Sequence, residues 1–262
     1  MCGDHYTLLT KHCLTVDNRF IIITPVYNAV KYIDECLDSL LSQAYDNYEI
    51  CVIDDCSTDG TWNRILQKQN NSNARMNICR NEYRIGSPLA NIVKGIELFA
   101  LDGEDIVAIV DGDDSLSHNA VLSDLNEVYQ DTGVYMTYGQ FVPLSGKYAP
   151  YCKEITDTVN YRKDEDWRAS HLKTFKRKLW DRIKDDDLRD KNGDYYKFIG
   201  DAAFMYPMVE MCGTEHMRFI SKVNYRYNDL NPLNELTTNR SEQLRLSEEI
   251  WAKPCYKKVD KL

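Results

Sequence analysis

The chain has 262 residues, of which 43% are hydrophobic and 28% are charged, and its formal net charge is -9. This composition is typical of a globular domain, and the acidic balance argues against a nucleic-acid groove, because such grooves cluster lysine and arginine against phosphates. No apolar run approaches the ~18 residues that a membrane span requires. Residues 1–5 lack the basic and apolar blocks of a secretory signal, so we expect an intracellular, cytoplasmic protein.

Nine cysteines are scattered along the chain without a Cys-x-x-Cys pair. The odd number and the irregular spacing argue against a zinc knuckle and against a disulfide framework. We therefore expect free thiols in a reducing compartment.

The amino-terminal region predicts an arm, a strand and a helix. Residues 1–18 show no periodicity and are expected to form the arm, and the apolar run at 20–24 predicts a first strand. Because Pro25 has no N–H for a central ladder, residues 25–28 are predicted to be the loop at the carboxyl end of that strand. An amphipathic helix is expected next, with a stripe formed by Ile33, Leu37, Leu40 and Leu41.

Two further strands follow with helices after them. Residues 49–53 predict a second strand, and Ser57 or Thr58 is expected to cap a helix that begins near Thr61. A third strand is predicted at 76–80, before a loop and a helix with the stripe Ile92, Ile96 and Phe99. This alternation of strands and helices is the βαβ pattern of a parallel sheet.

The most informative stretch is the strand expected at 106–110 with the acidic residues after it. Its apolar residues predict a strand that is buried on both faces. In open α/β sheets ligands bind beyond the carboxyl ends of strands. Asp111 and Asp113 flank Gly112, which cannot obstruct a close approach, so both carboxylates can face one Mg2+ or Mn2+ ion. The alternative is an ordinary acidic turn that also includes Asp114.

From Gly133 the pattern changes. A strand is expected at 134–138 after a helix with Val121, Leu125 and Val128, and residues 143–165 are rich in loops. The later segments predict, in order, a helix within 171–184, a helix at 202–211 opened by Gly200-Asp201, a strand at 218–227 and a polar helical tail at 241–262.

Three fragments together resemble the donor half of a family 2 glycosyltransferase of the GT-A fold. They are Thr24-Pro25-Val26-Tyr27-Asn28, then Val52-Ile53-Asp54-Asp55-Cys56-Ser57-Thr58-Asp59-Gly60-Thr61, then Val110-Asp111-Gly112-Asp113-Asp114. The resemblance is close over 19–142 and loose over 165–230. It implies one α/β domain with a Rossmann-like, mostly parallel sheet flanked by helices, in which 19–142 binds the donor and 143–240 is an acceptor-side extension. Enrichment in Asn, Tyr, Lys and Ile is typical of an AT-rich genome, such as that of a large DNA virus.

The resemblance also implies a donor site. A nucleoside base needs a flat face and an acceptor for its ring N–H, which Tyr27 and one of Asp54 or Asp55 can supply. Asp111 would contact the ribose or the metal, and Asp113 would bind the Mn2+ or Mg2+ ion that bridges the phosphates. The expected donor-binding residues are Pro25, Tyr27, Asp54, Asp55, Arg84, Asp111 and Gly112, and the expected metal ligands are Asp111 and Asp113.

In the resembling family an acidic residue that opens a later helix, usually preceded by Glu, acts as the general base. Asp201 matches this residue, whereas Gly200 replaces the Glu. The carboxylate would take the proton of an acceptor hydroxyl as it attacks the sugar C1 opposite the diphosphate, which inverts the anomeric centre. The alternative role of Asp201 is a helix N-cap. Secondary candidates for the acceptor or diphosphate site are His171, Lys173, Arg177, His216 and Arg226.

The predicted function is transfer of a hexose from a nucleotide diphosphate sugar, UDP-linked such as UDP-glucose, UDP-galactose or UDP-GlcNAc, to a hydroxyl of a glycan or protein acceptor. One rival is a haloacid-dehalogenase-like phosphatase with Asp111 as its nucleophile. Two complete βα units before Asp111, and Met205 in place of a late carboxylate, oppose it. A second rival, a sugar-phosphate nucleotidylyltransferase, would need a Gly-rich basic loop near the first strand. This chain has Thr24-Pro25-Val26-Tyr27-Asn28 there instead. A nucleotide-binding module without catalysis stays open.

Overall fold

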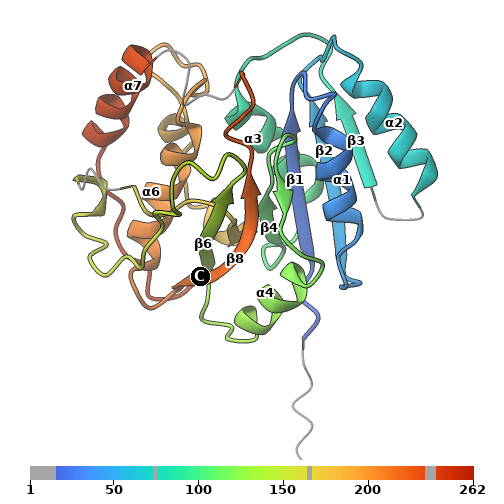
Figure 1. The fold of residues 1–262 in the computed structure, drawn as a ribbon. Coiled ribbons are helices and arrows are strands. Elements are labelled where there is room, and N and C mark those ends of the chain that lie inside the picture. Colours follow the sequence, from blue (N-terminus) through green and yellow to red (C-terminus); the bar gives the residue numbers. More distant parts are fainter. Residues whose placement is uncertain (1–15, 73–75, 164–166, 234–239) are drawn as a thin grey trace, which may run out of the picture.

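The computed structural model describes residues 16–72, 76–163, 167–233 and 240–262. Within them, eight strands form one sheet in the order β3-β2-β1-β4-β7-β6-β8-β5, and helices cover both of its faces (Figure 1). This mixed α/β architecture confirms the expected fold class. Most of the expected amino-terminal arm, residues 1–15, lies outside the described residues.

The first half of the sheet is parallel. Its strands are joined by helices, and each adjacent pair among them runs in the same direction. The strands are β1 (Phe20–Val26), β2 (Tyr48–Asp54), β3 (Met76–Arg80) and β4 (Ile106–Ile109). The connecting helices are α1 (Ile33–Leu41), α2 (Thr61–Asn71) and α3 (Pro88–Phe99). Because parallel strands end at one edge of a sheet, their terminal loops gather there.

The core lies on both faces of this sheet. Successive side chains of a strand point to opposite faces, so Ile21 and Ile23 pack with α3 and α6 (Gly200–Cys212), whereas Phe20 and Ile22 pack with α1 and α4 (Val121–Tyr129). Figure 1 shows α1 and α4 in front of the sheet and α3 behind it. Burial on both faces explains why these strands are continuous apolar runs.

The second half of the sheet begins with β7 (Lys173–Lys176), which pairs antiparallel to both β4 and β6. The predicted helix within 171–184 is present only as the single turn α5 (Arg177–Trp180), and the prediction is wrong for residues 173–176, which form the strand. The spacing of Phe175 and Leu179 fits a helix. The open edge of β4, however, offers backbone hydrogen bonds that outweigh this local pattern.

The remaining elements complete the sheet and one side of the molecule. β6 (Met136–Pro143) is parallel to β8 (Met217–Tyr227), and the short β5 (Ser115–Leu116), which the sequence did not predict, pairs antiparallel to β8. The helices at 202–211 and in the polar tail are present as α6 and α7 (Arg240–Ala252). Two short 3-10 turns are η1 (Tyr161–Lys163) and η2 (Asp185–Leu188).

The first strand is longer than predicted, because β1 continues through Pro25, which pairs with Ile53 of β2. The Pro25 carbonyl accepts a hydrogen bond from the Gly112 N–H (3.0 Å) beyond the end of β4 at Ile109. Because β4 has already ended on that side of β1, it presents no strand carbonyl there that requires the N–H proline lacks. The prediction that the strand ends before Pro25 is therefore wrong.

The expected cap of α2 is also different. Neither Ser57 nor Thr58 caps this helix, whose N-cap residue is a glycine in the left-handed conformation. The Asp59 carboxylate instead accepts hydrogen bonds from the N–H (3.0 Å) and the hydroxyl (2.6 Å) of Thr61. Ser57 serves the loop before the helix, where its hydroxyl accepts from the Asn28 N–H at 2.9 Å.

Two further expectations concern membranes and thiols. In the described part of the chain, no helix combines the length and the apolar character that crossing a membrane requires. All seven cysteines of the same residues are unpaired thiols, as expected.

Candidate active site

One cavity of about 770 Å³ opens beyond the carboxyl ends of β1, β2 and β4. The amino end of β7 and the first turn of α6 form its other side, because Lys173 and Asp201 also line it. Segments far apart in the sequence therefore contribute to one space. The predicted site residues that line this cavity are Pro25, Tyr27, Asp55, Arg84, Asp111, Gly112, Asp113 and Asp201.

Tyr27, Arg84 and Asp55 form one end of the cavity. The Arg84 guanidinium lies over the Tyr27 ring, 3.9 Å from its centroid, which is a cation–π contact. Asp55 is buried, and its Oδ1 accepts from the Asn81 amide (2.8 Å) and the Ile85 N–H (2.9 Å). Its Oδ2 accepts from the N–H of the following glycine at 2.8 Å. These bonds fix the carboxylate against the loop that carries Arg84.

Asp54 does not line the cavity, although it precedes Asp55 in the chain. Its side chain is fully buried, its Oδ2 accepts from the Ser57 N–H at 3.1 Å, and the Arg80 guanidinium lies 3.2 Å away. Burial raises the pKa of Asp54. Adjacent residues at a strand end point to opposite faces, so the two aspartates are separated. The sequence left Asp54 and Asp55 as alternatives for the base acceptor, and this geometry favours Asp55.

The acidic loop after β4 turns tightly against β1. A Cβ atom at Gly112 would come within 2.6 Å of the Val26 Cβ and 3.2 Å of the Pro25 carbonyl oxygen, so glycine is required there. The loop carries three carboxylates, and all three residues, Asp111, Asp113 and Asp114, line the cavity. Asp113 accepts a hydrogen bond from the Asn231 amide at 2.6 Å, which fixes one of its oxygens.

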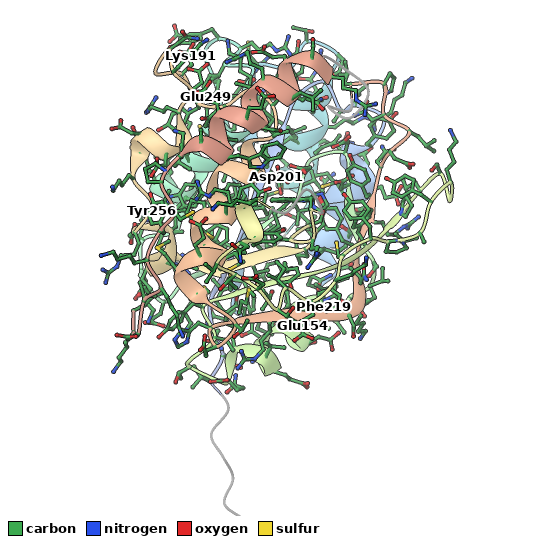
Figure 2. All side chains as sticks on the ribbon, turned by 90° about the vertical axis from the view of Figure 1, so that its left-hand side faces the viewer. Glu154, Lys191, Asp201, Phe219, Glu249 and Tyr256 are labelled. Atoms are coloured by element: carbon green, nitrogen blue, oxygen red, sulfur yellow. The ribbon has the colours of Figure 1, made fainter. Side chains whose placement is uncertain are left out.

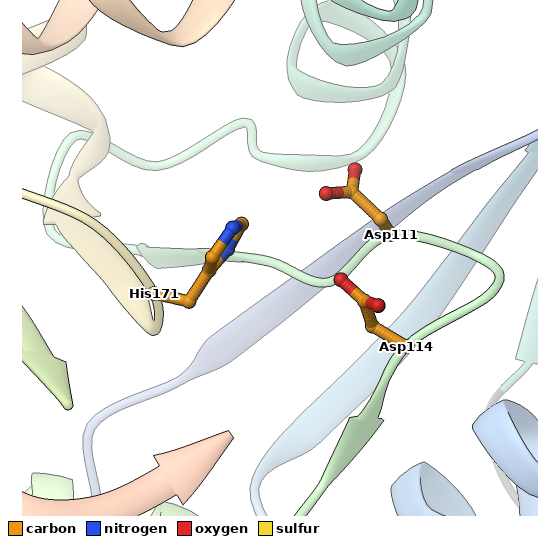
Figure 3. Close-up of side chains that lie close together, drawn as sticks. All are labelled: Asp111, Asp114 and His171. Atoms are coloured by element: carbon orange, nitrogen blue, oxygen red, sulfur yellow. The ribbon is translucent and has the colours of Figure 1, made fainter. Parts of the chain in front are cut away.

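Asp111, Asp114 and His171 form a group that can hold a metal ion. One ligand atom from each lies within 4.8 Å of the others, and Figure 3 shows the two carboxyls and the imidazole facing one another. Two carboxylates and a neutral imidazole suit Mn2+. The expected pair was Asp111 and Asp113. Asp113 lines the same cavity but is not in this group. Asp114, which belongs to the same motif, was not predicted from the sequence to be a ligand.

The charges of this group repel one another in the absence of a cation. Burial, together with the neighbouring carboxylates of Asp113 and Asp201, raises the pKa of Asp111 to about 6, while Lys173 opposes the shift. Burial and the neighbouring carboxylates of Asp113 and Asp111 raise the pKa of Asp114 well above its usual range. A divalent ion would remove this penalty, so the donor set fits a metal.

His171 is held in place by aromatic rings. Its imidazole stacks on the Tyr225 ring at 4.4 Å and on the Tyr227 ring at 5.5 Å. Burial, followed by the charge of Lys173, lowers the pKa of His171 well below its usual range. The ring is therefore neutral, which is the form that binds metals. Tyr225 also donates to Asp114 at 2.7 Å, and so it supports both members of the group.

Lys173 links this group to the first turn of α6. Its buried ammonium lies 3.3 Å from the Asp201 Oδ2 and 3.3 Å from the His171 Nδ1. The Asp201 side chain is 37% exposed, so a solvent-borne hydroxyl can reach it. The N-cap residue of α6 is Ile199, and Asp201 is therefore not the N-cap of this helix.

The secondary candidates divide into two sets. His171 and Lys173 line the cavity, whereas Arg177, His216 and Arg226 do not. Sequence reasoning missed Tyr225 and Asn231, which contact the acidic loop from more than 100 residues away. Neither residue carries a local motif, so only the strand order places them here.

The fold is a GT-A-type α/β domain, and its cavity lies at the edge where the parallel strands end. The chain belongs to glycosyl transferase family 2, whose family model matches residues 21–194, more than half of its length. It is 28% identical over 172 residues to the glycosyltransferase GlyG of Streptococcus pneumoniae, which covers 59% of this chain and 54% of GlyG.

Solved structures show the same fold. TarS of Staphylococcus aureus, in complex with UDP-GlcNAc, is similar with a TM-score of 0.65 and 22% identity over 87% of this chain and 65% of that chain. The mannosyltransferase PcManGT of Pyrobaculum calidifontis, in complex with GDP-Man and Mn2+, has a TM-score of 0.55 and 19% identity over 89% and 61%. The chain spans about half of GlyG and, over the matched sequence, 17% of TarS, to which it is 36% identical over 101 residues.

Proposed function

We propose that the protein transfers a hexose from a UDP-linked sugar to a hydroxyl group, with a divalent metal and with inversion at C1. One observation carries this proposal: Asp55, the acidic loop at 111–114 and Asp201 line the same cavity. Family membership supports transfer and does not favour the phosphatase. UDP-GlcNAc in the structure of TarS supports a uridine nucleotide as donor.

The uracil and ribose would bind at the end of the cavity with Tyr27 and Arg84. Stacking on this pair provides the flat face that a base requires. Asp55 supplies the acceptor: among the described residues its Oδ2 accepts one hydrogen bond, and a carboxylate oxygen has room for a second. A ring N–H of uracil can take that position.

The diphosphate would lie near the acidic loop. Asp111, Asp114 and His171, with Asp113 beside them, would hold Mn2+ or Mg2+ there. When bound, such an ion neutralises the charge that grows on the diphosphate leaving group. The protein itself orients these ligands through Tyr225, which contacts both Asp114 and His171.

Asp201 would act as the general base. Its exposed carboxylate can accept the proton of an acceptor hydroxyl that enters from solvent, while Lys173 holds it by an ion pair. The acceptor oxygen then forms a bond to C1 as the bond from C1 to the diphosphate oxygen breaks. Attack from the side opposite the leaving group inverts the configuration without a protein nucleophile.

The test is release of UDP from a panel of UDP-sugars with Mn2+ and with EDTA, next to GDP-mannose as a control donor. We expect metal-dependent release from at least one UDP-sugar. Release of phosphate from p-nitrophenyl phosphate without a response to any nucleotide sugar would instead support the phosphatase. Thermal stabilisation by UDP and Mn2+ without turnover would support a binding module.

A further inference from the structure

The cavity continues past Asp201 to an aromatic wall, which we define as Trp167, Tyr206 and Trp251. All three line the cavity. They come from the segment before β7, from α6 and from the end of α7. The rings of Trp167 and Tyr206 meet edge to face at 5.3 Å, and the Trp251 indole N–H donates to the Tyr206 hydroxyl at 3.2 Å.

Arg162 of η1 connects α6 to α7 beside the aromatic wall. The Arg162 guanidinium donates to both carboxylate oxygens of Glu210 at 2.7 Å, and both side chains are only 2% exposed. The same guanidinium donates to the Ile250 carbonyl at 3.2 Å, one residue before Trp251. The Trp251 N–H is already bonded to Tyr206. The side chain is still 39% exposed, so part of its ring surface is accessible to a ligand.

The chemistry of this side of the cavity is neutral. Besides the aromatic wall, α7 contributes Gln243, Ser247 and Ile250 to the lining. The basic residues that line the cavity within the described ranges, Arg84, Lys173 and Lys197, come from other segments. A phosphate-rich acceptor would need paired basic groups. Aromatic faces beside amide and hydroxyl groups suit a ring that has an apolar face and polar edges.

We propose that the aromatic wall is the acceptor subsite and that it binds a pyranose ring of a neutral glycan. This inference rests on the proposed function. The C–H groups on one face of a pyranose carry partial positive charge, which the negative face of an aromatic ring attracts. The hydroxyl groups at the ring edge can bond to the polar side chains of α7.

The position of the aromatic wall fits the proposed chemistry. Tyr206 and Asp201 lie on the same helix, five residues or roughly 7.5 Å apart along its axis, and both line the cavity. Figure 2, which faces the side formed by α6 and α7, shows Asp201 below α7. A sugar seated on the aromatic wall therefore shares one cavity with the proposed base, which is where the proposed function requires its acceptor hydroxyl.

The experiment compares Trp251→Ala, Trp251→Phe and a matched control, Leu244→Ala. Leu244 is on the same helix, is 56% exposed and does not line the cavity. Acceptors are methyl and nitrophenyl pyranosides, short neutral oligosaccharides, ribitol phosphate and a peptide with hydroxylysine. Saturation-transfer NMR with UDP and the diamagnetic ion Mg2+ measures binding of each, and initial rates give the acceptor KM.

We expect a neutral pyranoside to bind, and Trp251→Ala to raise its KM by about tenfold. Trp251→Phe should restore most of the loss, while Leu244→Ala should match the unmodified protein. Binding of ribitol phosphate or the peptide alone, failure of every pyranoside to bind, or an unchanged KM in Trp251→Ala would overturn the inference. Failure of the proposed function is distinct, because the unmodified protein would then neither bind UDP nor release it from any UDP-sugar.

Discussion

Gly200 and Leu89 lie so close that a Cβ atom at position 200 would come within 2.8 Å of the Leu89 Cβ. This contact seats the first turn of α6 against the first turn of α3 and places Asp201 at the cavity. It also leaves no room for a side chain at position 200, where the resemblance to the family led us to expect Glu.

Gly200→Ala should lower kcat for transfer by tenfold or more. The added methyl group meets a Cβ atom, which cannot rotate away, so the first turn of α6 must shift and carry Asp201 with it; about 1 Å of misplacement costs on the order of 100-fold in rate. Steady-state kinetics measure the effect. Gly103→Ala is the matched control, because its new Cβ would lie 3.4 Å from Lys178, an ordinary contact. Equal rates for both variants would contradict the role of the helix contact.

Asp201→Asn should retain UDP binding and lose transfer by about 100-fold or more, because the amide keeps the shape of the carboxylate but cannot accept the proton. Calorimetric titration with UDP and Mn2+ measures the first property, and sugar transfer measures the second. The nearby ion pair with Lys173 makes the amide variant preferable to alanine, which would leave a void beside the buried ammonium. Full transfer by Asp201→Asn would remove this residue from the mechanism.

Stabilisation by Mn2+ should increase as the pH rises through about 6. The pKa of Asp111 in the folded protein is about 6 and its ordinary value is 3.8, so between these values the native state binds more protons than the unfolded state. The metal-free protein therefore loses stability as the pH rises over this range. Because Mn2+ binds the deprotonated carboxylate, its effect on Tm should be larger at pH 7.5 than at pH 5.

Scanning calorimetry with Mn2+ and with EDTA measures both trends. Asp111→Asn is the control, since it removes the ligand that titrates near 6 and should reduce the pH dependence of the Mn2+ effect between pH 5 and pH 7.5. A Tm increase that is the same at both pH values would contradict the assignment of Asp111 as a ligand.

Arg84→Ala should weaken UDP binding by roughly 2- to 30-fold, which corresponds to the ~0.5–2 kcal/mol of a cation–π contact together with its stacking surface. Arg189→Ala is a matched control: Arg189 lies over the Tyr195 ring at 3.8 Å, as Arg84 lies over Tyr27 at 3.9 Å, but outside the cavity. Both variants remove the same kind of contact. Equal losses of UDP affinity would show that the effect is not local to the site.

The parallel half of the fold could be predicted from the sequence because its signals are local. The strand at 76–80 was expected with the bounds that the structure has, and buried runs such as 106–109 leave few alternatives. The strand β7 could not be predicted, because Phe175 and Leu179 fit a helix and the partner that decides between them, β4, lies about 70 residues earlier in the chain. Tertiary pairing overrode a local pattern there.

The residues of the candidate site also divide into those with a local sequence signal and those without one. The acidic loop and the tyrosine after β1 are short motifs at strand ends, so the sequence alone predicts that Asp111 and Tyr27 lie at the cavity that both residues line. The choice between Asp54 and Asp55 depends on which face of the sheet each side chain meets, and that requires the register of β2. The supports from β8 and beyond, Tyr225 and Asn231, have no local signal, because their role arises only when β8 reaches the acidic loop.

The placement of β7 between β4 and β6 has a consequence for how the protein is made. During synthesis the strands β1 to β4 can pair as soon as they emerge, yet the backbone edge of β4 stays uncovered until residues 173–176 arrive. An uncovered edge of this kind recruits other chains. A fragment that stops at residue 142 would keep the acidic loop and the Tyr27–Arg84 pair, yet it would expose that edge permanently, so the two halves of the chain are not separable modules.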